Sequence, residues 1–200
     1  MELIVISNPR FFEGEAALIN QLFESGMERF HLRKEGAEKH EYEQLLGNIN
    51  PEYLERVALH QFHELAVDFG IRRLHFPEAQ RKEGQHLLLR SPETTNLSTS
   101  IHNTDQITDL ENFKYTFYGP VFQSISKKDY PSVVPDGFKL RNPGTVKVIA
   151  LGGITPEKIN LVRQMGFDGA AILGSLWNIP ELALNHFKKS LEKCQRTDPM

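Results

Sequence analysis

The amino-acid sequence predicts a small (β/α)8 barrel, the TIM-barrel class of α/β fold, built as one domain over residues 1–200. Eight short apolar runs alternate with stretches of helical spacing, which indicates a parallel sheet whose strands are joined by helices. The expected strands begin between residue 3 and residue 168, a mean repeat of about 24 residues that a small barrel accommodates. An open doubly wound sheet is the alternative. However, Ser7-Asn8-Pro9-Arg10 follows the first strand, where a dinucleotide-binding fold has a glycine-rich turn.

The expected strands share short runs of β-branched, aliphatic and aromatic residues. They cover 3–6, 28–32, 57–60, 72–76, 97–101, 114–118, 146–151 and 167–173. Between them, apolar residues recur every three or four positions, which is the pattern of a helix that covers a sheet. The expected helices cover 13–25, 41–49, 62–69, 104–110, 156–165 and 180–194, with a single helical turn at 85–89.

Glycine, proline and capping residues place several of these boundaries. Gly26 and Gly70 stand where the first and third helices are expected to end. Thr155 followed by Pro156 is a typical helix start, because proline at the first helical position has no N–H to leave unpaired. The segment 122–143 contains three prolines and exceeds the usual loop length, so we expect it to be a functional lid.

Composition and charge exclude several classes of function. The chain has 23 Lys and Arg against 26 Asp and Glu, a net charge of −3, which disfavours a nucleic-acid-coating protein. No apolar run approaches the roughly 18 residues of a membrane helix, and the first residues lack the basic segment of a secretory signal. The single cysteine, Cys194, fits a reducing compartment. We therefore expect a cytoplasmic protein that binds neither nucleic acid nor membranes.

In a barrel of this class, the chemistry lies on the loops that follow the carboxyl ends of the strands. Histidines, which transfer protons near neutral pH, gather at these positions. Five of the eight fall at or just after an expected strand end: His31, His60, His63, His75 and His102. His102 is the best candidate for a general base, whereas His31 could equally be a hydrogen-bonded core group. His60 and His63 could form a metal pair, but no carboxylate-rich constellation surrounds them.

The last two expected strands indicate an anion site. Gly152-Gly153 follows the seventh strand and Gly174-Ser175 follows the eighth, where backbone N–H groups can approach a phosphate closely. The alternative is that these glycines only end their strands tightly. Arg33, Lys34 and Lys127 would add positive charge for a second phosphate, although such residues often lie on a solvated face.

These motifs, in this order, resemble the thiamin phosphate synthase and TenI-like thiazole tautomerase family. The most specific segment, 119–127, reads Gly-Pro-Val-Phe-Gln-Ser-Ile-Ser-Lys and is similar to the family's Gly-Pro-Ile-Phe-x-Thr-x-Thr-Lys. Further matches are His31-Leu32-Arg33, Ser100-Ile101-His102, Ala150-Leu151-Gly152-Gly153-Ile154 and Gly169-Ala170-Ala171-Ile172. The resemblance covers nearly the whole chain and implies a (β/α)8 barrel that is usually a homodimer.

The resemblance also implies a set of binding residues. The glycines and serine after the last two strands would hold the phosphate of a thiazole phosphate. Arg33 and the segment after the sixth strand would face a pyrophosphate in the synthase. Lys34 and Ser100 lie next to these motifs and are added to the set. The candidates for binding substrate and phosphate are therefore Arg33, Lys34, Ser100, Ser124, Ser126, Lys127, Gly152, Gly153, Gly174 and Ser175.

The departures from the family pattern concern its metal. The synthase carries Asn-Asp after strand 3 and a second Asp after strand 4, and these carboxylates hold the Mg²⁺ that neutralises the pyrimidine pyrophosphate. Here His60-Gln61 and Gln80 stand at those positions, and the family's second basic residue is replaced by Glu35. Glu78, displaced by two positions, is the carboxylate left to bind Mg²⁺. We therefore expect no metal unless the chain is a synthase.

The sequence favours a metal-free, TenI-like aromatisation (tautomerisation) of a carboxythiazole phosphate. In this hypothesis His102 takes the proton, directly or through water, while His31 or His60 returns or guides it. The first alternative is thiamin phosphate synthase, which joins a pyrimidine pyrophosphate to thiazole phosphate with Mg²⁺ and releases pyrophosphate. The second is a non-catalytic protein that binds thiamin or thiazole phosphate, and a histidine-based metal hydrolase is more distant.

Overall fold

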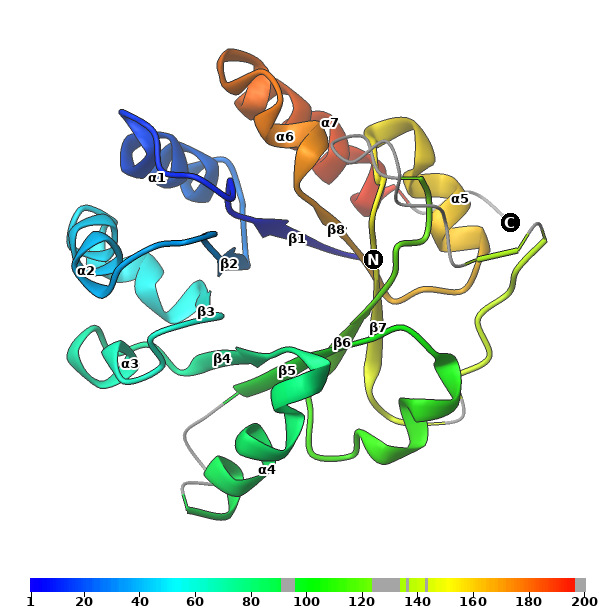
Figure 1. Ribbon diagram of the computed structural model, residues 1–200. Helices are drawn as coiled ribbons and strands as arrows, with labels where there is room; N and C mark the ends of the chain where they lie inside the picture. The colour runs from blue at the N-terminus through cyan, green and yellow to red at the C-terminus, as the bar shows by residue number, and fades with distance from the viewer. Residues whose placement is uncertain (91–95, 124–133, 136, 143, 197–200) are drawn as a thin grey trace.

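A computed structural model shows eight parallel strands that close into a barrel in chain order, with β8 pairing back to β1. Helices and short helical turns surround the strands (Figure 1). The structure describes residues 1–90, 96–123, 134–135, 137–142 and 144–196. The expected (β/α)8 barrel is confirmed, because every strand pairs in parallel with its neighbours and the sheet has no open edge.

The strands lie close to their expected positions and are mostly shorter. They are β1 (Glu2–Ile6), β2 (Phe30–Leu32), β3 (Val57–Leu59), β4 (Arg73–Phe76), β5 (Asn96–Ile101), β6 (Tyr115–Tyr118), β7 (Lys147–Leu151) and β8 (Gly169–Ile172). The expected second strand loses its first residues because β2 pairs with β1 only from Phe30 onward.

The helices follow the expected order, with shifted bounds. They are α1 (Glu15–Glu24), α2 (Lys39–Gly47), α3 (Leu65–Asp68), α4 (Arg81–Arg90), α5 (Ile159–Gln164), α6 (Gly174–Trp177) and α7 (Ala183–Gln195). Helix α3 is shorter than expected because Phe62 has φ +52°, a left-handed conformation that a right-handed helix cannot contain. The expected helix at 104–110 is a 3₁₀ helix, Thr104–Asp109, and 3₁₀ turns also occur at Pro51–Arg56, Glu78–Gln80, Pro156–Lys158 and Pro180–Leu182.

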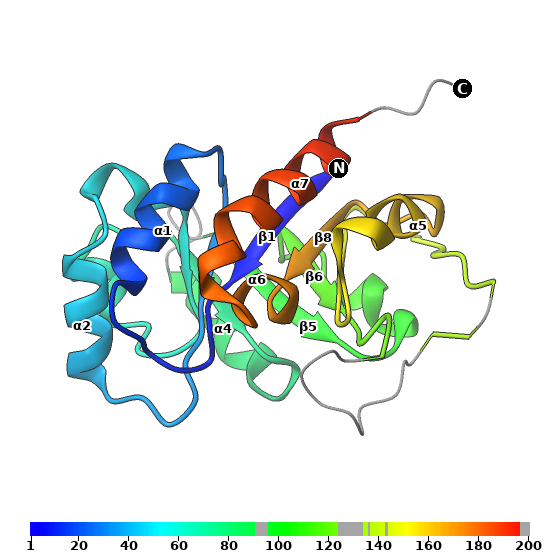
Figure 2. The ribbon, with the colours of Figure 1, turned by 90° about the horizontal axis from the view of Figure 1, so that it is seen from above.

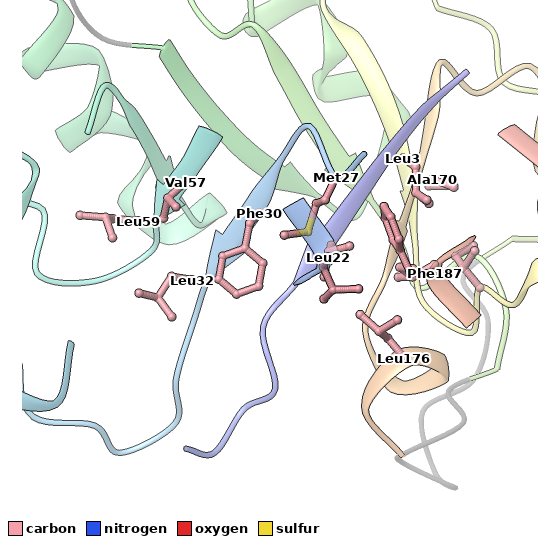
Figure 3. Packing of buried hydrophobic residues seen from close by; sticks show 14 of the residues in the cluster. Leu3, Leu22, Met27, Phe30, Leu32, Val57, Leu59, Ala170, Leu176 and Phe187 are labelled. Atoms are coloured by element: carbon pink, nitrogen blue, oxygen red, sulfur yellow. The ribbon is translucent and has the colours of Figure 1, made fainter. Parts of the chain in front are cut away.

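The main core lies between the strands and the surrounding helices. Outward-facing side chains such as Phe30 and Leu32 on β2 pack there against helix residues such as Leu22 of α1 (Figure 3). Helix α7 lies across β1 and beside α1 and α5 (Figure 2). Its Phe187 side chain is fully buried in the core. Every helix in the described part of the chain is too short or too polar to cross a lipid bilayer.

The barrel interior holds a second, smaller cluster. Alternate residues of a strand face opposite sides of the sheet, so one set from each strand points inward. The apolar members of the inward set are Ile4, Ile6, Tyr115, Phe117, Ile149 and Ala171. Polar side chains from β2, β4 and β5 complete the interior, where barrels of this class usually carry bulky aliphatic residues. The candidate site lies at the end of the barrel above these polar interior residues.

Candidate active site

A cavity of about 510 Å³ opens where the loops after the strands meet. Its volume lies within the range of small-molecule sites. Apolar side chains of the barrel interior, including Phe117 and Leu151, contribute to its lining. The cavity brings together these residues expected from the sequence: Arg33, His60, Ser100, Gly152, Gly153, Gly174 and Ser175.

The glycine pair after β7 is required by the backbone. Gly152 has φ +98° and Gly153 has φ +63°, conformations that residues with a side chain rarely adopt. A Cβ atom on Gly153 would lie 2.4 Å from the carbonyl oxygen of Gln123, and one on Gly152 would lie 2.6 Å from Cβ of Pro120. Both glycines therefore let the segment after β6 pack closely, and their place in the cavity wall leaves them open to a ligand as well.

His31 is the centre of a hydrogen-bonded group beneath the cavity. It is fully buried on β2. Its Nδ1 lies 2.8 Å from Nε2 of His60, and its Nε2 lies 2.6 Å from the hydroxyl of Tyr115. His31 is thus a satisfied interior group and also a direct partner of the cavity residue His60.

His75, on β4, packs directly beside this group. Its ring stacks on His60 with centroids 4.0 Å apart. Its Nδ1 lies 2.9 Å from Oγ of Ser98, and its Nε2 lies 3.1 Å from Oγ of Ser100. His75 and Ser100 both line the cavity.

Burial keeps these three imidazoles neutral. The loss of hydration disfavours the imidazolium form and lowers the pKa of His75 from 6.5 to about 3. The same cause, with neighbouring positive charges, places the pKa values of His31 and His60 well below 6.5. Near neutral pH each ring therefore has one nitrogen that donates a hydrogen bond and one that accepts.

His102, directly after β5, is not among the residues that line the cavity, and its side chain is 58% exposed. Its Nδ1 lies 2.9 Å from Oε2 of Glu78. Hydrogen bonds from His102 and Gln106 hold the pKa of the Glu78 carboxyl below its usual value. The ionised carboxylate of Glu78 accepts a hydrogen bond from Nδ1–H of His102. Nε2 is then the ring nitrogen that can accept a proton.

The expectation that Lys34 binds phosphate is corrected by the structure. Its side chain is completely buried, and its ammonium pairs with the carboxylate of Glu15 and donates to the carbonyl oxygen of Arg10. In this conformation Lys34 supports the loop after β2 and is not available to a ligand. Arg33 does line the cavity, with its side chain 46% exposed and 3.4 Å from Glu35.

The residues at the family's magnesium positions do not suit that ion. Gln61 accepts a hydrogen bond from Tyr42, and its amide nitrogen donates to the carbonyl oxygen of Lys34 at 2.6 Å. Gln80 is an exposed amide, and Glu78 is already paired with His102. Mg²⁺ prefers carboxylate and phosphate oxygens, so this donor set does not match the carboxylate cluster that the resemblance implies.

Among the described residues, His63 does not join His60 in the cluster of histidines whose nitrogens could share a metal ion. Nε2 of His63 lies 3.1 Å from the carbonyl oxygen of Leu59 and 3.2 Å from that of His75. A nitrogen between two carbonyl acceptors carries a proton, so Nε2 of His63 has no lone pair for a metal.

Some expected residues cannot be placed, and some residues of the site were missed. Ser124, Ser126, Lys127 and most of the expected lid lie outside the described residues. Sequence reasoning missed Ser98 and Tyr115, as well as the pairing of Glu78 with His102. Strand alternation could have revealed Ser98 and Tyr115, because it places both on the inward face with His31 and His75.

Comparison with known proteins identifies the family. The family model described as thiamine monophosphate synthase (TMP-TENI) matches residues 3–176. The chain belongs to this family. The resemblance seen in the sequence motifs is thereby confirmed for this TMP-TENI member.

Relatives of this TMP-TENI protein carry the synthase name. The thiamine-phosphate synthase of Staphylococcus haemolyticus is 26% identical over 176 residues, which cover 80% of this chain and 79% of the relative. The thiamine phosphate pyrophosphorylase structure from Bacteroides thetaiotaomicron has a TM-score of 0.77 and 25% identity, covering 98% of this chain and all of its own. The Pyrococcus furiosus structure of the same name, at 16% identity and a TM-score of 0.75, shows the shared fold. These names support the synthase alternative better than the tautomerase hypothesis.

Proposed function

We propose that this TMP-TENI protein binds a phosphorylated thiazole and moves a proton on it without a metal, a tautomerase-type reaction. The observation that carries the proposal is the donor set of the cavity. Neutral imidazoles and hydroxyls line it, and amides stand where the resemblance implies magnesium carboxylates. Such groups suit proton transfer, whereas the neutralisation of a pyrophosphate calls for a divalent cation.

The phosphate of the ligand would lie against the loops after β7 and β8. Gly152 and Gly153 bring backbone close to the cavity without a Cβ atom, and Gly174 and Ser175 face the same space. Arg33 supplies the positive charge and the planar donor geometry that phosphate oxygens favour. This end of the cavity would fix the ligand, while the imidazoles lie across from it on β3 and β4.

His102 would act as the general base in this proposal. Glu78 fixes its Nδ1–H, so the exposed Nε2 is free to accept a proton from the ligand, directly or through water. A positioned base of this kind contributes about 10² to 10⁴ in rate. Ser100 lies near the carboxyl end of β5, and His102 directly follows this strand.

Turnover of two substrate sets, measured side by side with and without Mg²⁺, tests the proposal. Aromatisation of a carboxythiazole phosphate in the presence of a chelator is the expected result. Magnesium-dependent release of pyrophosphate from a pyrimidine pyrophosphate plus thiazole phosphate would refute it in favour of the synthase, the second candidate that the relatives' names support. Thermal stabilisation by thiazole phosphate without turnover in either assay would instead indicate a binding protein.

A further inference from the structure

One nitrogen of the three packed imidazoles, His31, His60 and His75, is left for a ligand. Both nitrogens of His31 are hydrogen-bonded, and so are both nitrogens of His75. His60 bonds to His31 through Nε2, whereas its Nδ1 has no hydrogen-bond partner in the described part of the chain. Because His60 also lines the cavity, its Nδ1 is the imidazole nitrogen that a bound ligand can meet.

The hydroxyl of Tyr115 decides whether this nitrogen carries a proton. It lies 2.6 Å from Nε2 of His31, and within the described residues it has hydrogen-bond geometry with no other group. A buried O–H without an acceptor is costly, so the hydroxyl donates to His31. The distance agrees, because it lies within the range of O–H donors and below the usual range of N–H donors. The guanidinium of Arg29, 4.7 Å from the centre of the Tyr115 ring, favours the same direction by stabilising negative charge on the oxygen.

This direction fixes the proton on the next two rings. A neutral imidazole has one nitrogen that donates a hydrogen bond and one that accepts. Because Nε2 of His31 accepts from Tyr115, its Nδ1 donates to Nε2 of His60, 2.8 Å away. The proton of His60 is then on Nδ1. Burial keeps both rings neutral, since it lowers their pKa values well below 6.5.

We propose that His60 presents Nδ1–H to the cavity as a fixed, neutral hydrogen-bond donor, and that Tyr115 and His31 are positioning residues that hold this tautomer. The assignment rests on the proposed tautomerase-type function and adds an electrophilic group to it. The acceptor is a ring nitrogen or carboxylate oxygen of the carboxythiazole, conjugated to the carbon that loses its proton to His102. This atom gains negative charge in the reaction, and a donor already aimed at it stabilises the transition state. No proton leaves His60, so its ring is unchanged after each turnover.

Multiple-bond ¹H–¹⁵N spectra of the unliganded protein show which imidazole nitrogens carry protons. We expect Nδ1–H on both His31 and His60, and the signal that disappears in His60→Asn identifies His60. Nε2–H on His60 would overturn the proposal, because its Nδ1 would then be an acceptor. This measurement needs neither substrate nor turnover, so it decides the tautomer even if the proposed reaction fails.

Two substitutions of His60 test the donor in turnover. His60→Asn keeps an N–H near the position of Nδ1, whereas His60→Leu fills similar space without a donor. Loss of one such donor lowers kcat by about 10²- to 10³-fold, and we expect this loss in His60→Leu and a smaller one in His60→Asn. The pH dependence of kcat should keep its shape in both variants, because His60 neither gains nor loses a proton. Equal losses in the two variants, or a His60→Leu rate equal to wild type, would overturn the donor role while leaving metal-free tautomerisation intact.

Tyr115→Phe tests the positioning role. Without the hydroxyl, Nε2 of His31 can carry the proton, so the tautomer of His60 is no longer fixed. We expect the Nδ1–H signal of His60 to weaken and kcat to fall, with a much smaller change in KM. Tyr118→Phe is the matched control, because Tyr118 lies on the same strand but packs against Phe138 and Phe167. An unchanged His60 tautomer in Tyr115→Phe would refute the positioning role, and the His60 variants at the cavity wall remain usable should this buried substitution fold poorly.

Discussion

Acidification from pH 7 to pH 5 is expected to destabilise the folded chain through its buried histidines. In the unfolded chain a histidine takes up a proton near its ordinary pKa of 6.5, whereas burial lowers the pKa of His75 to about 3 in the folded state. Below the ordinary pKa, the unfolded state therefore binds more protons than the folded state. The free energy of unfolding then falls as pH falls.

The size of the effect follows from the two pKa values. One pKa unit corresponds to about 1.4 kcal/mol, and pH 5 lies about 1.5 units below the ordinary value, so His75 alone removes about 2 kcal/mol. His31 and His60 shift in the same direction for the same reason and add to the loss. For a chain with a typical stability of about 5–15 kcal/mol, this is a large share.

Urea unfolding at a series of pH values measures this effect directly, since the midpoint and slope give the free energy of unfolding. A drop of at least about 2 kcal/mol between pH 7 and pH 5 is expected for the wild type. His75→Asn is expected to have a shallower pH dependence, whereas His40→Asn, at an exposed position on α2, should follow the wild type. A wild-type free energy that stays constant over this range would refute the burial argument.

Three further predictions concern single substitutions. Tyr115→Phe leaves Nε2 of His31 without its partner, so urea unfolding should show a loss of about 1–3 kcal/mol. Gly153→Ala forces a Cβ against the carbonyl oxygen of Gln123; we expect a lower melting temperature and weaker binding of thiazole phosphate by calorimetry. His102→Ala should lower turnover by about 10²- to 10⁴-fold without weakening the binding of thiazole phosphate.

Each of these predictions has a control in the chain. Tyr118→Phe should cost less stability than the Tyr115 variant, and equal losses would contradict the hydrogen-bond argument. Gly36 also has a positive φ, +66°, but open space around it, so Gly36→Ala separates backbone strain from steric clash. Glu78→Gln should lower turnover less than removal of the His102 ring; an undiminished rate in the His102 variant would exclude it as the base.

The fold could be predicted from the sequence because its signals are local. Alternation of apolar runs and helical spacing fixed the order of the elements, and glycine or proline marked several of their ends. The errors arose where tertiary contacts overrule local pattern. The expected turn at 85–89 is the longer helix α4, in which Gly84, a poor helix residue, lets the helix approach the ring of Phe76. Helix α3 is shortened by the backbone of Phe62, which no composition pattern reveals.

The site was predictable in its location but only partly in its contacts. Strand ends placed Arg33, His60 and the glycine loops around one cavity, because parallel strands deliver their carboxyl ends to the same face. Lys34 shows the limit of this approach. A lysine next to a cavity-lining arginine gives no local sign that its ammonium will be buried against Glu15, a residue of another element.

The sequence by itself determined the barrel, the family and the replacement of magnesium carboxylates by amides, since these depend on residue types and their order. Only the tertiary structure decided how the histidines act together. His31, His75 and Tyr115 come from three strands, and the closure of the barrel turns all three inward, where His31 bonds to Tyr115 and His75 bonds to Ser98. The neutrality of the imidazoles has the same origin, because packing against neighbouring strands removes them from water and lowers their pKa values.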